Sequence, residues 1–252
     1  MDLEALNLRL RPRGPYEAID LGQALLRRNL REVYTAWAAT VLPLGIAFAA
    51  LAPVVEWLPI VLMWWFKPLY DRIVLVVLSR GVFGERVTVR DLPWRSIFDR
   101  SLWWSLTLGR FVATRSFMLP VTMLEGLDRA RRRLRMRTLL KGARFPATLL
   151  TTAFLYAEQA LALGYLPLVV LLAPQGVDVP VWRWLTDESM PLWLSMVGDV
   201  SYLMALTLLE PLYVACGFTL YLNRRVELEA WDIELDLRQQ LKGDGPDRRE
   251  AA

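Results

Sequence analysis

The sequence predicts an all-α polytopic membrane protein with about four transmembrane helices, and three observations lead to this fold class. Hydrophobic residues make up 55% of the 252 residues, and eleven are tryptophan, a composition typical of integral membrane proteins. Several apolar stretches reach the roughly 20 residues that a helix needs to cross a hydrocarbon core about 30 Å thick. Amphipathic, arginine-containing segments separate these stretches.

Composition also limits the chemistry that the chain can perform. The sequence has no histidine, which removes the commonest metal ligand and the usual general base near neutral pH. The single cysteine, Cys216, lies in an apolar run and is interpreted as an inert buried thiol. Because no metal-ligand spacing, phosphate-binding loop or Ser/His/Asp set is present, we expect no enzyme activity, no cofactor and no metal site.

The first expected element is an amphipathic helix on the membrane surface, over residues 14–32. Gly14 and Pro15 suit a helix start, because proline at the first helical position loses no needed N–H. Apolar residues recur at helical spacing with arginines close by; they are Tyr16, Ile19, Leu26 and Leu30. A short soluble helix is the alternative. The region lacks the apolar core of a signal peptide, so the first span is expected to direct insertion.

Two spans follow, and the second is interrupted. Residues 33–55 carry no charge and form the clearest span. Residues 57–78 contain Lys67, Asp71 and Arg72 near their middle, and Pro68 splits them into two apolar halves. Neither half crosses a bilayer alone. We therefore predict a discontinuous helix that breaks at Pro68.

The region from 79 to 144 is polar to amphipathic. Within it, residues 101–127 are apolar but interrupted by Arg110, Arg115 and Pro120. They are interpreted as interfacial or re-entrant helices, with a fifth span as the alternative. Residues 128–144 then hold eight basic residues and one acid, which predicts a cytoplasmic segment.

The second half, 145–241, repeats the arrangement of the first half, 1–144. Residues 145–173 form a span with one charge, Glu158, and residues 192–222 form a span that carries Asp199, Glu210 and Pro211. A second helix break is predicted at Pro211. The loop between these spans has three acids and one arginine, so it should face outward, which leaves both termini in the cytoplasm.

An internal repeat connects the two interrupted spans. "KPLYDRIVLVVLSR" begins at Lys67, and the similar "EPLYVACGFTLYLNR" begins at Glu210. Each half holds two spans, and an even number of spans returns the chain to the same side. The chain is therefore predicted to consist of two parallel pseudo-repeats, followed by a disordered tail over 242–252.

Six ionisable residues lie within the predicted spans, and an isolated charge there costs about 2.5–3.5 kcal/mol. We expect a buried network in which Lys67 meets Glu210 or Glu158; the full set is Lys67, Asp71, Arg72, Glu158, Asp199 and Glu210. Such a network either fixes which helices meet or forms a path for an ion or substrate. The interpretation as a structural device is preferred, because four spans without histidine offer little for transport.

The segment 226–241 predicts an amphipathic tail helix with two apolar stripes. One stripe contains Leu228, Trp231 and Leu235 and is expected to dock a partner protein. Acidic residues flank both stripes, which argues against binding to anionic lipid. Docking of this helix onto the arginine-rich segment 129–144 is expected.

The two ends of the chain resemble the membrane domain found with glycerophosphodiester phosphodiesterases and its YciC-like relatives. The matching residues near the C-terminal end are Tyr221, Arg224, Arg225, Glu227, Glu229 and Asp232, in an apolar helix, a short arginine-containing turn and an acidic helix. The start, "EAIDLGQALLRRNLREVY", is similar to the surface helix of that group. The resemblance implies a bacterial inner-membrane protein without a catalytic domain; such domains have about six spans, whereas four are counted here.

These observations predict a non-catalytic membrane scaffold, or assembly component, of a bacterial envelope complex. The expected partners are the lipid bilayer and other envelope membrane proteins or a second copy of the chain. Nucleic acid is not expected, since positive-inside topology already accounts for the arginine run. The alternative is a small transporter or lipid-handling protein, which would need a cavity beside Lys67, Glu158 and Glu210.

Overall fold

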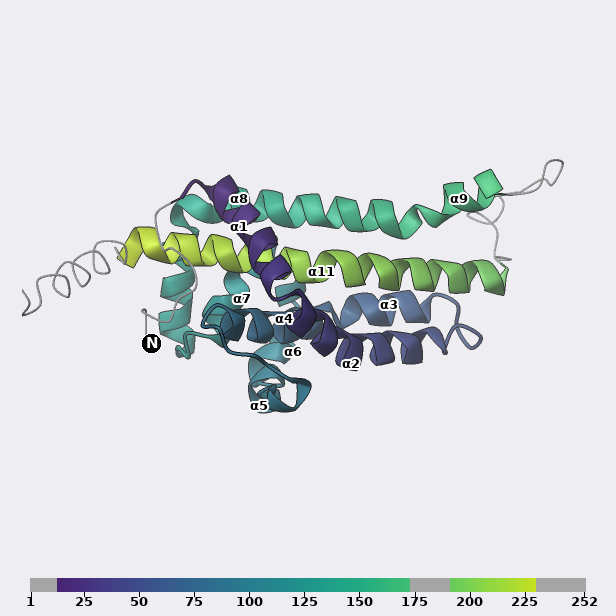
Figure 1. Ribbon diagram of the computed structural model, residues 1–252, viewed down its shortest axis with the longest axis horizontal. Helices are drawn as coiled ribbons and strands as arrows, with labels where there is room; N and C mark the ends of the chain where they lie inside the picture. The colour runs from purple at the N-terminus through teal and green to yellow at the C-terminus, as the bar shows by residue number, and fades with distance from the viewer. Residues whose placement is uncertain (1–12, 173–190, 230–252) are drawn as a thin grey trace, which may run out of the picture.

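The computed structural model describes residues 13–172 and 191–229, and this part of the chain is helical without any strand. In chain order the helices are α1 (Pro15–Arg28), α2 (Leu30–Ala49), α3 (Leu58–Trp65), α4 (Lys67–Gly81), η2 (Val89–Asp91), α5 (Trp94–Ile97), α6 (Arg100–Leu106), η3 (Gly109–Phe111), α7 (Arg115–Met123), α8 (Arg129–Leu163), α9 (Tyr165–Leu172) and α11 (Leu192–Glu229). The long helices α2, α8 and α11 lie roughly side by side along the long axis of the molecule, and α1 runs obliquely across them (Figure 1).

Three helices of the described part are long and apolar enough to cross a membrane. They are Leu30–Ala49, Arg129–Leu172 and Leu192–Glu229, which supports the expected membrane protein. Residues 101–127 lie in α6, η3 and α7. The nine residues of α7 rise about 13 Å, well short of the hydrocarbon thickness, so no single helix of this region is long enough to cross.

The second expected span is interrupted close to Pro68. Helix α3 ends at Trp65 and α4 begins at Lys67, with Phe66 between them. Pro68 thus lies in the first turn of α4, where its missing N–H removes no bond within that helix. Neither α3 nor α4 has the length of a span, so they do not count among the three long helices.

The helix break predicted at Pro211 is wrong, because α11 continues from Leu192 to Glu229 with Pro211 inside it. Proline removes one backbone hydrogen bond and crowds the carbonyl four residues earlier. Membrane helices tolerate this where neighbouring helices hold them, and α11 contacts α1, α2, α4, α7 and α8 along its length. The continuous helix also includes Arg224 and Arg225, where a short turn was expected.

The expected surface helix α1 lies across α11 (Figure 1). Its buried residues are Ala18, Gly22, Leu25 and Leu26. At Gly22 the two backbones approach so closely that a Cβ atom would lie 2.5 Å from the Cα of Cys216. The apolar face of α1 therefore packs against protein.

Helix α8 bends between its basic start and its apolar continuation. Lys141 and Gly142 leave helical geometry, and Gly142 has a φ of 98°, a conformation that favours glycine. Pro146 has no N–H to offer the Gly142 carbonyl. The guanidinium of Arg224 donates to the neighbouring Lys141 carbonyl, so α11 holds the bend in place.

Helix α4 lies in the interior and carries the charged residues of the interrupted span. Thirteen of its fifteen residues are buried, and it contacts α2, α5, α6, α7 and α11. A helix that is covered on all sides must satisfy its polar groups through its neighbours. The candidate site begins at its first residue.

Candidate functional site

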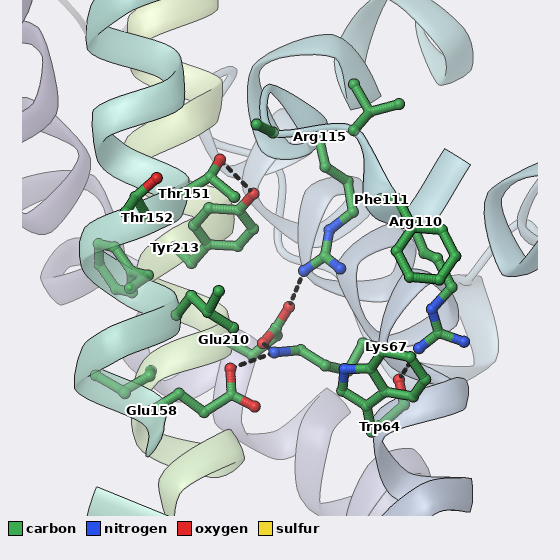
Figure 2. A pocket seen from close by; sticks show the side chains of 15 residues that line it. Trp64, Lys67, Arg110, Phe111, Arg115, Thr151, Thr152, Glu158, Glu210 and Tyr213 are labelled. Atoms are coloured by element: carbon green, nitrogen blue, oxygen red, sulfur yellow. Dashed lines mark hydrogen bonds and ion pairs between the residues drawn. The ribbon is translucent and has the colours of Figure 1, made fainter. Parts of the chain in front are cut away.

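Lys67 lies between two carboxylates that come from two different helices. Its Nζ is 2.8 Å from Oε2 of Glu210 on α11 and also pairs with Oε2 of Glu158 on α8. All three residues are at most 5% exposed. Figure 2 shows the lysine pointing from the start of α4 toward both carboxylates. Lys67 therefore contacts both of the partners that the sequence offered as alternatives.

Arg115, the first residue of α7, extends this arrangement. Its Nη2 donates to Oε1 of Glu210 at 2.9 Å, and its Nε lies 3.0 Å from Oδ2 of Asp71. The resulting series runs from Glu158 through Lys67, Glu210 and Arg115 to Asp71, and we call these five residues the charge cluster. It contains three acids and two bases from α4, α7, α8 and α11.

The charge cluster connects helices that are far apart in the sequence. Taking an ion out of water costs several kcal/mol even after relaxation, and a well-placed partner offsets that cost. Each base of the cluster contacts two carboxylates and shares Glu210 with the other base, so loss of Lys67 would leave Glu158 without a counter-ion and loss of Arg115 would leave Asp71 without one. The cluster thus joins four helices through buried ion pairs.

Two of the six predicted network residues do not join the cluster. Arg72 faces away from Asp71, because successive helical residues point about 100° apart. Its Nη1 donates to the Ile97 carbonyl at 3.0 Å and its Nη2 to Oγ of Ser101 at 2.8 Å. The neighbouring Asp99 has a lowered pKa, because backbone N–H groups, first that of Arg100, and the charge of Arg72 favour its ionised form.

Asp199 is the second predicted residue outside the cluster. Eleven residues separate it from Glu210 on α11, which corresponds to about 16 Å along the helix. It is fully buried, and neither carboxylate oxygen has a hydrogen-bond partner within the described ranges. The expectation of one network that includes Arg72 and Asp199 is therefore wrong.

Tyr213 and Tyr70 occupy equivalent positions of the internal repeat but have different surroundings. The Tyr213 hydroxyl lies 3.0 Å from Oγ1 of Thr151 and accepts a hydrogen bond from the backbone N–H of Ser116 at 3.3 Å. Tyr70 instead packs edge-on against Trp37, with ring centroids 5.9 Å apart. Tyr213 thus connects α7, α8 and α11 beside the charge cluster.

Arg110 takes the place of the hydrogen-bond donor that Pro68 lacks. The backbone N–H of residue 68 would serve the Trp64 carbonyl four residues earlier in an unbroken helix, and Nη2 of Arg110 donates to that carbonyl at 2.7 Å. The guanidinium carbon also lies 3.4 Å from the centre of the Trp64 ring and 4.5 Å from that of Trp65. Arg110 therefore stabilises the end of α3.

A cavity of about 290 Å³ lies beside the cluster. Figure 2 shows charged and aromatic side chains arranged around it. Its polar lining consists of Lys67, Arg110, Arg115, Thr151, Thr152, Glu158, Glu210 and Tyr213, and its apolar lining includes Trp64, Phe111, Phe154 and Leu155. The sequence had identified Arg110 and Arg115 only as interruptions of an apolar segment, and it had singled out Tyr213 only as part of the repeat.

The predicted docking stripe of the tail lies mostly outside the described residues. Leu228 is 40% exposed at the end of α11, whereas Trp231 and Leu235 fall in the part that is not described. Next to Leu228, Glu229 pairs with Arg135. The start of the tail thus contacts the arginine-rich segment.

No family model, curated protein or solved structure matches the chain. The resemblance of its two ends to the phosphodiesterase-associated membrane domain stays a prediction.

Proposed function

We propose that this protein is a non-catalytic membrane scaffold, an assembly component of a bacterial envelope complex in the inner membrane. The observation that carries the proposal is the pairing within the charge cluster, where each base contacts two carboxylates in a buried setting. Paired buried charges are suited to fixing which helices meet. A rigid bundle of this kind presents its outer surfaces to partners in a constant arrangement.

The proposal includes a four-span topology with both termini in the cytoplasm. In this topology α3 and α4 together make one interrupted crossing, while α2, α8 with α9, and α11 make the other three. The two hairpins are proposed as parallel pseudo-repeats that meet at the cluster. Support comes from Lys67 and Glu210, the first residues of the two repeat segments, which contact one another.

A second candidate function is lipid handling or transport, and the cavity favours it. A path for a lipid or solute needs space beside the intramembrane charges, and the cavity is lined by Lys67, Glu158 and Glu210. The two candidates differ in what the charges do. In a scaffold they hold helices together, whereas in a transporter they contact the cargo.

The test compares Lys67→Met with the double variant Lys67→Met/Glu158→Gln. The single variant leaves two carboxylates facing each other without the lysine, whereas the double variant removes one full ion pair and keeps Glu210, Arg115 and Asp71 intact. Size-exclusion chromatography and quantitative mass spectrometry of solubilised native membranes would report the proteins that co-purify.

A scaffold predicts loss of the co-purifying partners in the single variant and their recovery in the double variant. Co-purification that survives both changes, together with loss of lipid or solute movement, would favour the second candidate. A chain that is monomeric and has no stoichiometric partner in its native membrane would contradict the scaffold.

A further inference from the structure

Arg110 is the one base of the cavity lining that meets no carboxylate within the described residues. Lys67 and Arg115 each contact two. Arg110 is only 8% exposed. Its Nη2 donates to the Trp64 carbonyl, while its Nη1 is buried and makes no hydrogen bond.

The contacts that Arg110 does make leave its charge incompletely compensated. Stacking on Trp64 supplies a cation–π interaction, which is favourable in a desolvated setting. A buried guanidinium, however, has five N–H donors and a full charge, and an unpaired buried ion costs several kcal/mol. An anion with two or more oxygens is the natural complement, since guanidinium binds phosphate in a bidentate manner.

Three features of the cavity suit an anion with several oxygens: its charged lining, its volume and the exposed apolar side chains beside it. Three bases and two acids line it, and Asp71 pairs with Arg115 just outside the lining, so Arg110 is the base whose charge no ion pair of the described residues compensates. Its volume of about 290 Å³ is at the lower end for ligand sites and suits a head group without its acyl chains. Phe111 and Leu155 line the cavity and are 73% and 50% exposed, which provides an apolar surface for acyl chains outside it.

We infer that the cavity beside Arg110 binds a phosphate-bearing anion, and that its source is the head group of an anionic phospholipid whose acyl chains remain in the bilayer. The Arg110 guanidinium supplies the positive charge, and Thr151 and Thr152 lie in the same lining. This inference deepens the second candidate function and rests on the cavity. It does not require the scaffold to be correct.

The test measures lipid retention by native mass spectrometry and thermal stabilisation of the full chain in detergent. The added probes are phosphatidylglycerol, phosphatidylcholine and inorganic phosphate. We expect phosphatidylglycerol to act at roughly tenfold lower concentration than phosphatidylcholine, because its head group lacks a cation beside the phosphate. An equal effect of inorganic phosphate alone would assign the site to a soluble anion.

Two variants and one control make the test specific. Arg110→Gln removes the charged donor and should abolish the preference for phosphatidylglycerol over phosphatidylcholine. The loss of a charged hydrogen bond corresponds to about a tenfold or larger change in affinity. Thr152→Trp fills the cavity from an exposed lining position and leaves Arg110 in place. Arg100→Gln, at an exposed position outside the cavity, changes the net charge equally and should retain the preference.

Folding and binding remain separable in this design. If Arg110→Gln unfolds because the Trp64 carbonyl loses its donor, Thr152→Trp decides the outcome. The inference is overturned if a folded variant of either kind retains the full preference for phosphatidylglycerol, or if the native chain shows no preference for any phosphate-bearing probe. Unchanged co-purification of partner proteins in that case would leave the scaffold proposal standing.

Discussion

The candidate spans in α8–α9 and α11 have the same hydropathy but different surroundings. Both reach a mean hydropathy of 1.6 over an 18-residue window, yet 11% of that window is buried in the first and 67% in α11. Helix α11 is the central element of the bundle, whereas α8 exposes many of its apolar side chains. Lipid tails and a protein core are equally apolar, so hydropathy alone does not distinguish a central helix from a peripheral one.

The largest expected effect concerns Lys67, whose ion pairs connect α4 to both α8 and α11. Lys67→Met should lower the free energy of unfolding by about 3–5 kcal/mol, because it leaves Glu158 and Glu210 buried without that base. Thermal unfolding in detergent, followed by tryptophan fluorescence, would measure it. The added change Glu158→Gln should restore a substantial part of the loss, and an unchanged melting temperature in Lys67→Met would contradict a structural role.

A pair of leucines tests the difference in burial directly. Leu206 on α11 is fully buried, whereas Leu161 on α8 is 45% exposed. Leu206→Ala should cost about 2–5 kcal/mol, as cavity-forming substitutions do, and Leu161→Ala should cost less than about 1 kcal/mol. Equal losses in Tm would mean that α8 is as enclosed as α11 in the native membrane.

The contact of α1 with α11 depends on a small residue. Gly22→Ala would place a Cβ atom 2.5 Å from the Cα and 2.7 Å from the backbone N of Cys216, and neither backbone atom can rotate away. We expect a loss of about 1–3 kcal/mol, typical of overpacking. Gly14→Ala is the matched control, since nothing lies within 4 Å of its added Cβ.

The smallest effect is expected for the ion pair between Arg135 on α8 and Glu229 on α11. Arg135 on α8 contacts Glu125 and, on α11, Glu229, and these side chains are partly exposed. Arg135→Gln should cost less than about 1 kcal/mol, and added salt should reduce the difference from the native chain. Arg131→Gln serves as control, because Arg131 is 80% exposed in its ion pair with Asp128. A large, salt-independent loss would place Arg135 in a less solvated setting.

Hydropathy and charge predicted the properties of single helices better than the contacts between helices. The interruption near Pro68 and the pairing of Lys67 with carboxylates of the second half followed from isolated charges in apolar segments. The same reasoning treated Pro211 like Pro68 and was wrong. The sequence pattern also left Arg110 and Arg115 outside the site. Over residues 101–127 it indicates interfacial or re-entrant helices, and the local sequence does not show how close such helices come to Lys67.

By itself, the sequence determined that this chain is helical, that it contains apolar helices of spanning length and that charges within them need partners. These properties follow from each segment's own composition and from the cost of unpaired polar groups in an apolar medium. Only the tertiary structure decided that α11 is central, that Arg115 completes the charge cluster and that Arg110 serves the Trp64 carbonyl. Such choices depend on contacts between residues far apart along the chain, where several pairings satisfy the same local pattern.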